Sequence, residues 1–392
     1  MRRNINAGID VGTHDVKVVL VEYTKNSSPV VVGTGKASTE GMHKGYVRDI
    51  DAVSESIKKA IAQAENTANF KIKNAYISCG GIGMTGENTT GYSIISRADK
   101  EVTNLDIKNA IDGSEENLNL QNKKIIHISP IAYRLDGKEV YGDPTGMKGA
   151  KLEVKVIFVT TNKKHMDDLV SAVAENGIEV SGIYPGILSN AKILLTERQK
   201  TAGCALIDIG EDITTLAVFE NNTLISLQTY PIGGSDITSD IALYFKISLE
   251  EAEGVKIGSV LRDYPKKQVD VIIEARLGDI FESIENHLKK LKRNGLLPAG
   301  VIITGGGAHI SRIEQVAKSY LNLPACVGPY DKTLSQKLKI RDDTWYNATS
   351  LALPNLDLKS NLNLQMSNLS NIKNDLGGFK QFFKSILSQL LP

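Results

Sequence analysis

Cysteine is scarce in this sequence of 392 residues, which holds only Cys79, Cys204 and Cys326, far apart from one another. An odd, widely spaced set excludes a disulfide framework and indicates a reducing compartment. No C-x-x-C or H-E-x-x-H spacing occurs, so a structural zinc site is not expected. The six histidines are scattered, which gives no support for a metal cluster or a Ser-His-Asp triad.

A strong net charge and long apolar runs are also lacking. The formal charge is +1, so no overall field favours nucleic acid, and none is expected as a partner. The first residues lead straight into a strand-like run without the apolar segment of a signal peptide. No run approaches the roughly 18–20 apolar residues that would span a bilayer. The body of the protein is therefore expected in the cytosol.

Strand-like and helix-like segments alternate along the chain, which favours an α/β architecture. Helical spacing is clear at residues 52–68, where Val53, Ile57 and Ile61 lie four apart. NAYISCGG predicts a short strand, and HMDDLVSAVAENG predicts a helix that ends near Gly177. Residues 249–293 are strongly helical and charged.

Two regions depart from this alternation. Residues 84–161 combine three strand-like pieces with one helical piece, which indicates a small α+β unit inserted into the first domain. After Pro354 the sequence becomes rich in Asn, Ser and Leu and predicts a flexible tether.

One hairpin pattern occurs twice. AGIDVGTHDVKVVLVEY at residues 7–23 predicts a strand, a tight turn with Asp-x-Gly and a second strand, and ALIDIGEDITTLAVFEN at residues 205–221 aligns with it without gaps. Two equivalent hairpins indicate two related domains that face each other across a cleft, whereas two ordinary hairpins are the alternative. Glycine lets a backbone N–H approach a phosphate, and the aspartates would lie beside a Mg²⁺ and its waters. The coinciding residues are Asp10 and Asp208, Gly12 and Gly210, Val18 and Leu216, and Glu22 and Glu220.

A third motif, VIITGGGAHISRIEQVAKSYL at residues 301–321, predicts a buried strand, a turn of three glycines and an amphipathic helix. Such a geometry places backbone amides and a helix N-terminus near a nucleotide. The order of the three motifs is more specific than any one of them.

Together these motifs resemble the actin-like ATPase superfamily, and nearly the whole chain is similar to its FtsA family of bacterial cell-division proteins. The resemblance implies an α/β, actin-like (ribonuclease H-like) two-domain fold with an inserted α+β 1C subdomain. It implies subdomain 1A at residues 1–83 and 162–204, subdomain 1C at 84–161, subdomain 2A at 205–248, subdomain 2B at 249–297, a return through 2A and 1A at 298–354, a flexible linker at 355–376 and an amphipathic helix at 377–392.

The resemblance also implies the residues of an ATP site. The first phosphate loop would hold Asp10, Gly12, Thr13 and Lys17, the second Asp208, Gly210 and Thr214, with Gly233 and Gly234 near the cleft, Glu253 and Lys256 facing the adenosine, and Gly305, Gly306 and Gly307 as the adenosine turn. Asp10 and Asp208 would hold Mg²⁺ through water. Lys17 could equally be an ordinary exposed strand lysine.

Two departures from the family pattern concern hydrolysis. Tyr184 stands where related filament proteins carry a glutamate that positions water, and a tyrosine with a pKa of about 10 is a poor base. Glu211 and Asp212 replace the commoner glycines of the second loop, and they would repel a triphosphate unless Mg²⁺ intervenes or they point away. We therefore expect good ATP binding and slow hydrolysis; turnover of many ATP molecules per second would contradict this.

GIGMTG at residues 81–86 matches the dinucleotide signature G-x-G-x-x-G. The sequence after it is strand-like rather than helical, so we interpret it as the junction into the insert.

The last residues predict an amphipathic helix in the membrane interface, with a helix that docks on the protein's own core as the alternative. Lys380 and Lys384 lie at the flank of the apolar arc, where their stems can reach along the apolar surface to the interface. The apolar arc consists of Phe379, Phe382, Phe383, Ile386, Leu387, Leu390 and Leu391.

The resemblance implies an ATP-binding protein that forms filaments on the cytoplasmic face of the membrane at the division site. Its implied partners are the C-terminal peptide of FtsZ, further copies of itself, membrane lipid, and downstream division proteins through subdomain 1C. Arg276 in subdomain 2B matches a position implicated in FtsZ binding, although a solvated helix arginine explains it equally well. A pilus-assembly adapter and a small-molecule kinase of the same superfamily are the alternatives.

Overall fold

The computed structural model describes residues 4–24, 27–259, 264–328 and 343–353. These residues form two compact units, a larger one of residues 4–88, 118–126 and 157–353 and a smaller one of residues 89–117 and 127–156. The predicted linker and the C-terminal helix with its apolar arc lie outside the described residues.

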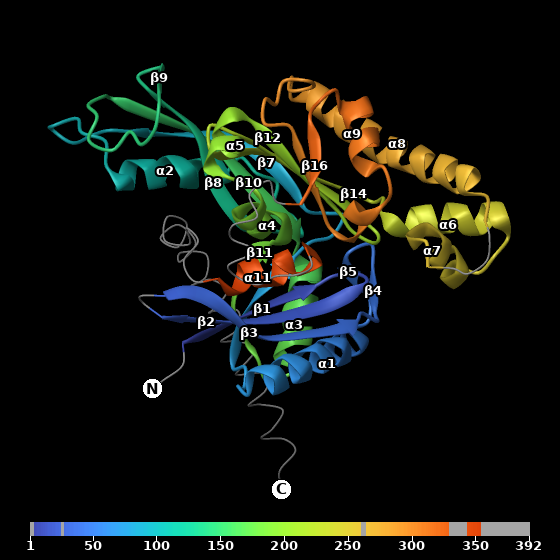
Figure 1. Ribbon diagram of the computed structural model, residues 1–392. Helices are drawn as coiled ribbons and strands as arrows, with labels where there is room; N and C mark the ends of the chain where they lie inside the picture. Colours follow the sequence, from blue (N-terminus) through green and yellow to red (C-terminus); the bar gives the residue numbers. More distant parts are fainter. Residues whose placement is uncertain (1–3, 25–26, 260–263, 329–342, 354–392) are drawn as a thin grey trace, which may run out of the picture. The chain divides into compact units, whose positions relative to one another are not determined.

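The larger unit contains a first sheet with the strand order β11-β6-β1-β2-β3 (Figure 1). Strands β1, β2 and β3 form an antiparallel meander, and β6 and β11 are added parallel to β1. The strands are β1 (Ile5–Val11), β2 (Asp15–Thr24), β3 (Ser27–Ser38), β6 (Asn74–Cys79) and β11 (Glu179–Pro185), and a separate short hairpin pairs β4 (Met42–His43) with β5 (Tyr46–Val47).

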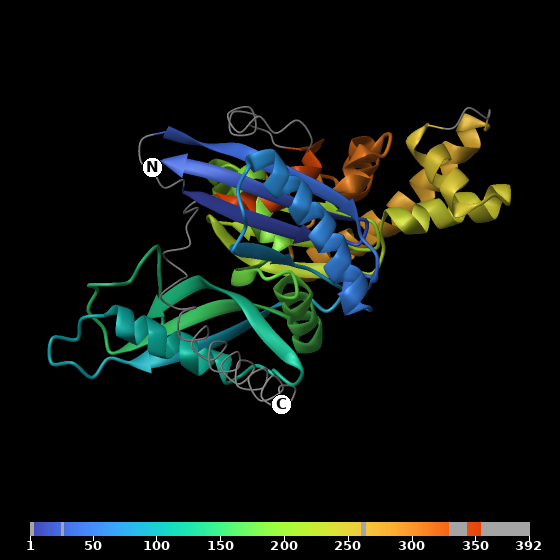
Figure 2. The same ribbon diagram turned by 90° about the horizontal axis from the view of Figure 1, so that it is seen from below.

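Helices cover both faces of this sheet. Helix α1 (Ile50–Ala68) lies across β3, as Figure 2 shows, with α3 (Lys163–Ala174) beside it. Helices α4 (Gly186–Leu194) and α11 (Tyr346–Ala352), the latter preceded by the 3-10 helix η2 (Asp343–Trp345), pack on the other face. Close approach depends on glycine, since a Cβ at Gly35 would lie 1.9 Å from the carbonyl oxygen of Ala60 in α1, and one at Gly8 would lie 2.1 Å from that of Ala348 in α11.

The second sheet has nine strands, and its first five repeat the topology of the first sheet. Their order is β16-β15-β12-β13-β14, again an antiparallel meander of three strands with two more added parallel to the first, and β14 then pairs with β7 (Thr85–Ile94) through Gln228 and Thr85. The predicted duplication is therefore confirmed at the level of the sheet. The strands are β12 (Cys204–Ile209), β13 (Thr214–Glu220), β14 (Thr223–Tyr230), β15 (Val301–Thr304) and β16 (Ala325–Val327).

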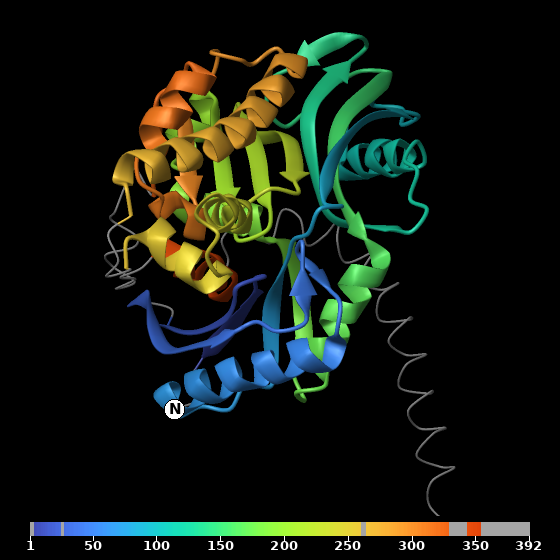
Figure 3. The ribbon, with the colours of Figure 1, turned by 90° about the vertical axis from the view of Figure 1, so that its right-hand side faces the viewer.

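Helix α8 runs across this second sheet (Figure 3) and buries an apolar stripe against it. Val269, Ile273, Leu277 and Ile280 lie on the stripe at helical spacing, which explains why this charged segment is a helix with one buried face. The helices around this sheet are α5 (Glu197–Ala202), α6 (Gly234–Phe245), α7 (Leu249–Ile257), α8 (Lys266–Lys290) and α9 (Ile313–Leu321).

The described residues of the smaller unit lie within the predicted insert, residues 84–161, and the remaining residues of the insert belong to the larger unit. Helix α2 (Asn104–Glu115) packs closely on its strands, because a Cβ at Gly91 would lie 2.0 Å from the carbonyl oxygen of Ala110. The strand order is β7-β10-β8-β9, and β7, β8 and β10 carry residues of both units. The strands are β7 (Thr85–Ile94), β8 (Lys123–Leu135), β9 (Lys138–Val140) and β10 (Lys151–Asn162).

Most predicted elements are present. The dinucleotide-like motif at residues 81–86 leads into strand β7 rather than a helix, which confirms that it is not a dinucleotide signature. One prediction is wrong in detail. The glycine turn at residues 305–307 does not lead directly into the amphipathic helix. A short 3-10 helix, η1 (Gly306–His309), comes first, and α9 starts only after Arg312, whose φ of 64° interrupts the helical path.

Candidate functional site

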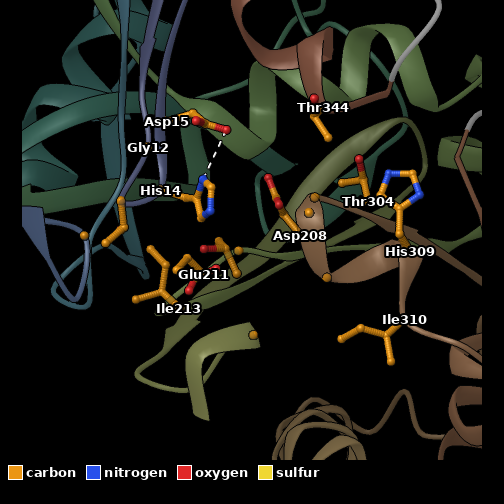
Figure 4. Close-up of a pocket in the computed structure, with 18 of the residues that line it drawn as sticks. Gly12, His14, Asp15, Asp208, Glu211, Ile213, Thr304, His309, Ile310 and Thr344 are labelled. Atoms are coloured by element: carbon orange, nitrogen blue, oxygen red, sulfur yellow. Dashed lines mark ion pairs between the residues drawn. The ribbon is translucent and has the colours of Figure 1, made fainter. Parts of the chain in front are cut away.

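A cavity of about 900 Å³ opens within the larger unit, a size typical of ligand sites (Figure 4). Two turns line it: the first turn, residues 12–14 between β1 and β2, and the second turn, residues 210–213 between β12 and β13. The glycine turn at residues 305–307, the end of β6 and parts of α7 and α8 complete the lining.

The two turns have the same hydrogen-bond geometry. The N–H of Gly12 donates to the carbonyl oxygen of Asp15 at 3.1 Å, and the N–H of Gly210 donates to that of Ile213 at 2.9 Å. In the strands behind them, Asp10 is the partner of Lys17 and Asp208 the partner of Thr215. The structure thus places both aspartates and both glycines at one cavity, as the aligned repeat predicts.

Thr214 does not line this cavity, although the family resemblance implied it for the second phosphate loop. Its side chain is fully buried, and its hydroxyl donates to the carbonyl oxygen of Ile232 at 2.8 Å. The offset of 198 between Asp10 and Asp208 equates Thr215 with Lys17, and Thr215 does line the cavity. Successive residues of a strand point to opposite faces, so the choice of Thr214 was one residue out of register.

The two aspartates of the repeated hairpin accept hydrogen bonds from amide or hydroxyl groups. Asp10 Oδ1 accepts hydrogen bonds from Ser78 Oγ at 2.6 Å and Asn347 Nδ2 at 2.7 Å, and Asp208 Oδ2 accepts one from Asn190 Nδ2 at 3.3 Å. Burial raises the pKa of the Asp10 carboxyl, and the charge of Lys17 and these hydrogen bonds offset part of the rise. The two carboxylates are therefore fixed in orientation.

Asp15 gathers three basic groups beside the first turn. Its carboxylate lies 2.8 Å from Lys36 Nζ, 3.2 Å from His14 Nδ1 and 3.7 Å from Lys17 Nζ. Burial would raise the pKa of Asp15, but the hydrogen bonds from His14 and Lys36 and the charge of Lys17 outweigh it and lower the pKa to about 2. All four residues line the cavity together with Asp10, so this side combines two carboxylates with two lysines, and both lysines lie against Asp15.

The glycine turn needs its glycines for two different reasons. Gly305 has a φ of +89°, and a Cβ there would lie 2.3 Å from Asp208 Oδ1. A Cβ at Gly307 would lie 2.4 Å from Ile209 Cγ2. A Cβ at Gly306 meets no described atom within 4 Å, although Gly306 lines the cavity. At Gly306 the open space belongs to the cavity itself.

Glu253 and Lys256 also line the cavity, and they form an ion pair with each other. Lys256 Nζ lies 2.6 Å from Glu253 Oε2, and it donates to the carbonyl oxygen of Gly234 at 3.1 Å and to Thr238 Oγ1 at 2.9 Å. Gly234 lines the cavity, whereas Gly233 packs under the second turn, where a Cβ would lie 2.4 Å from the carbonyl oxygen of Glu211.

The two acidic residues of the second turn point in different directions. Asp212 is buried, and its carboxylate accepts hydrogen bonds from the N–H of Lys44 and from Ser235 Oγ, both at 2.8 Å. Asp212 thereby links the β4–β5 hairpin to the second turn. Glu211 faces the cavity (Figure 4).

Tyr184 lies outside the cavity lining. Its ring lies 6.0 Å from that of Tyr76, and burial raises the pKa of its hydroxyl to about 12. Because the Tyr184 hydroxyl stays protonated near neutral pH and lies outside the cavity lining, it cannot accept a proton from a water in the cavity.

Arg276 is engaged within the protein. Its guanidinium donates two hydrogen bonds to Asp240 of α6, at 2.7 and 2.9 Å, and one to Asp279 at 3.1 Å. This bidentate pair ties α8 to α6.

Five further residues line the cavity but were not among the site residues expected from the sequence: Lys36, Ser78, Asn190, Thr215 and Asn347. Only Thr215 could have been found from the sequence, by extending the aligned repeat.

His165, which lines one wall of the cavity, carries a pH-dependent prediction. Its ring is 3% exposed, and its Nε2 has no hydrogen-bond partner among the described residues. Burial lowers its pKa to about 4, from an ordinary value of about 6.5 for histidine. Between these values the unfolded chain binds a proton that the folded chain does not, so stability falls as the pH falls from about 6.5 towards 4.

We expect wild type to lose about 1.5–2 kcal/mol more stability than His165→Gln between pH 7 and pH 5. Urea unfolding at both pH values measures the difference. Other titrating groups, including His14, are common to both proteins and cancel. Equal losses would show that the ring is not held neutral.

Comparison with known proteins agrees with this architecture. The family model described as "Cell division protein FtsA" matches residues 205–349, and the one described as "SHS2 domain inserted in FTSA" matches residues 81–160. The latter range is close to the predicted insert.

Curated relatives match over most of the chain. FtsA of Bacillus subtilis (strain 168) is 31% identical over 335 residues, which cover 80% of this chain and 76% of the relative. FtsA of Pseudomonas aeruginosa is 28% identical over 346 residues, which cover 82% of each chain, and FtsA of Escherichia coli (strain K12) is 25% identical over 355 residues, which cover 83% of this chain and 84% of the relative.

Solved structures support the fold alone. The PilM-PilN type IV pilus biogenesis complex matches with a TM-score of 0.66 at 16% identity, covering 88% of this chain and 97% of that chain. MreB5 of Spiroplasma citri bound to AMPPNP matches with a TM-score of 0.51 at 14% identity, covering 95% and 99%.

None of the helices in the described ranges is long and apolar enough to cross a bilayer. The duplicated sheet, the two facing turns and the inserted α+β unit form an actin-like, two-domain fold. With its family matches and its relative at 31% identity, the chain belongs to the FtsA family of cell division proteins.

Proposed function

We propose that this protein binds Mg-ATP in the cavity, forms filaments on the cytoplasmic face of the membrane at the division site, and tethers FtsZ there. The division role follows from family membership. The observation that carries the nucleotide is the pair of equivalent turns, with their glycines and aspartates, at one cavity opposite the glycine turn.

The lining residues suit a magnesium nucleotide. Lys17 and Lys36 offer positive charge to phosphates, and the open face of Gly306 leaves room for a flat ring. Asp10 and Asp208 would hold the ion through its waters. No group of three or more metal-binding side chains occurs among the described residues, and Mg²⁺ usually needs only one or two carboxylates besides water and phosphate. The bound ion would neutralise phosphate charge, while the protein positions and desolvates the nucleotide.

We propose that hydrolysis is slow. Tyr184 stands at the place of the family's water-positioning glutamate, but it lies outside the cavity lining and its pKa is raised. A protein promotes this reaction by positioning the reactants, including the attacking water, and by stabilising charge, and Tyr184 does not position a water.

The partner surfaces are proposals from the family pattern. FtsZ's C-terminal peptide would bind subdomain 2B, residues 249–297, and the insert at residues 84–161 would contact a neighbouring copy or downstream division proteins. We propose the other subdomain boundaries on the same family resemblance. Because Arg276 already pairs with Asp240 and Asp279, an acidic peptide would have to compete with these carboxylates.

Membrane attachment would depend on the helix at residues 377–392. A short helix with two lysines binds anionic lipid only modestly, since each basic residue adds about 1 kcal/mol. Many such helices on one filament would bind far more strongly through effective concentration. Polymerisation and membrane attachment are therefore expected to be coupled.

Liposome co-sedimentation tests this proposal. We expect the full chain to pellet with anionic vesicles, more so with ATP than without, and a variant that lacks residues 379–392 to remain in the supernatant with an unchanged melting temperature. Replacing Phe382 and Phe383 with serine in the full chain should have the same effect. Vesicle binding by the truncated chain would refute the anchor.

The two alternatives have distinct tests. Co-sedimentation with FtsZ's C-terminal peptide supports the division tether over a pilus-assembly adapter. Phosphorylation in a coupled assay with a panel of sugars would instead support a small-molecule kinase.

A further inference from the structure

The two turns have the same backbone geometry, but the second carries acidic side chains that the first lacks. The offset of 198 that equates Asp10 with Asp208 also equates Thr13 with Glu211. Lys17 and Lys36 face the cavity from the first side, and Thr215 is the neutral counterpart of Lys17 on the second. A negative ligand between the turns therefore meets lysines on one side and a carboxylate on the other.

Asp212 does not contribute to this charge at the cavity. Its carboxylate is used by the N–H of Lys44 and by Ser235 Oγ, and it is buried away from the lining. Glu211 is therefore the acidic side chain that the second turn presents to a ligand.

No hydrogen bond reaches the Glu211 carboxylate from the described residues. Burial raises its pKa, and the charges of Lys256 and His14 lower it. Both bases are engaged with other carboxylates: Lys256 with Glu253 at 2.6 Å and His14 with Asp15 at 3.2 Å. The negative charge of Glu211 is thus only weakly compensated by the protein.

We infer that Glu211 makes nucleotide binding depend on the metal, by repelling a triphosphate that lacks Mg²⁺ and tolerating one that carries it. The inference rests on the proposed ATP site and adds a specificity residue to it. Two charges about 6 Å apart at an effective dielectric constant of about 20 repel strongly enough to change affinity by more than tenfold. A bound divalent ion cancels most of this repulsion.

The test is a fluorescence titration of the full chain with mant-ATP, in excess MgCl₂ and in excess EDTA. Glu211→Gln removes the charge at nearly constant volume, and Glu211→Thr copies the residue of the first turn. Glu211→Asp retains the charge. Glu282→Gln removes the same charge from an exposed position on α8 that does not line the cavity, and serves as the control.

In EDTA, we expect Glu211→Gln and Glu211→Thr to bind at least about tenfold more tightly than wild type. In MgCl₂ they should stay within about threefold of it. Glu211→Asp and Glu282→Gln should behave as wild type. If the neutral variants weaken in EDTA as much as wild type, Glu211 does not set the metal requirement. If they lose more than about tenfold in MgCl₂, Glu211 holds the metal itself and the repulsion argument fails.

If the proposed ATP site itself is wrong, the titration gives a different result. Wild type would then bind no mant-ATP in either solution, which would overturn both statements at once. Thermal unfolding of each variant shows whether it is folded, and the two neutral variants provide independent readings.

Discussion

Replacing Gly306 with valine is expected to abolish ATP binding and leave the protein folded. Gly306 lines the cavity, its φ is not in the left-handed region, and a Cβ there meets no described atom within 4 Å. The new side chain would occupy the space that we assign to the ligand rather than space needed by the core. Titration with mant-ATP in MgCl₂ should show no saturable binding, and the melting temperature should change by less than about 3 °C.

The neighbouring glycine provides the matched control. Gly305→Ala places a methyl group 2.3 Å from Asp208 Oδ1, at a φ of +89° that L residues rarely adopt. We expect it to lower the free energy of unfolding by about 2 kcal/mol or more, through backbone strain and steric overlap. If Gly306→Val binds mant-ATP as wild type does, the nucleotide does not lie against the glycine turn.

The duplicated hairpin shows what could be predicted from the sequence. A turn with Asp-x-Gly between two apolar strands is a local pattern, and its two copies share the hydrogen bond from Gly12 to Asp15 and from Gly210 to Ile213. The same alignment gave the equivalence of Asp10 and Asp208. The family resemblance implied Thr214, whereas the alignment equates Lys17 with Thr215, and strand alternation turns Thr215 rather than Thr214 towards the cavity.

The rest of the site depends on contacts between segments far apart in the chain. Asn347 reaches Asp10 across 337 residues, and Lys44 reaches Asp212 across 168. Lys36 joins the cavity because β3 pairs with β2 and sets it opposite Lys17. Pairing of this kind leaves no periodic or motif signal in the sequence, so neither these partners nor the way that Asp212 turns aside could be predicted.

The charge of the cavity follows from the same long-range contacts. Asp15 lies at the end of the first turn and would weaken the attraction for a phosphate if it stood alone. Lys36 comes to within 2.8 Å of it and Lys17 to within 3.7 Å, so the two lysines offset its charge. The anion site therefore depends on the lysine pair as a unit.

Replacing both Lys17 and Lys36 with methionine is accordingly expected to weaken ATP binding by at least about a hundredfold. A hydrogen bond between charged groups contributes about 1.5–3 kcal/mol, and two such contacts with phosphate would be lost. Adenosine has no phosphate, so the affinity for adenosine should change little. It is measured by competition with mant-ATP on wild type and by calorimetry on the variant. The ratio of ATP affinity to adenosine affinity should therefore fall by about the same factor as the ATP affinity.

A second effect separates the lysines' two roles. Asp15 is 8% exposed and, of its basic partners among the described residues, would keep His14 alone. The pKa of Asp15 should therefore rise, and the double variant should lose about 1–3 kcal/mol of stability. The control is Lys59→Met, which replaces an exposed lysine on α1 outside the cavity lining and should change neither ATP affinity nor stability.

If ATP affinity survives in the double variant while stability falls, Lys17 and Lys36 neutralise Asp15 and do not hold phosphate. If adenosine affinity falls in parallel with that of ATP, the variant has lost the shape of the cavity. Only a selective loss of ATP places the phosphates between the first turn and its two lysines.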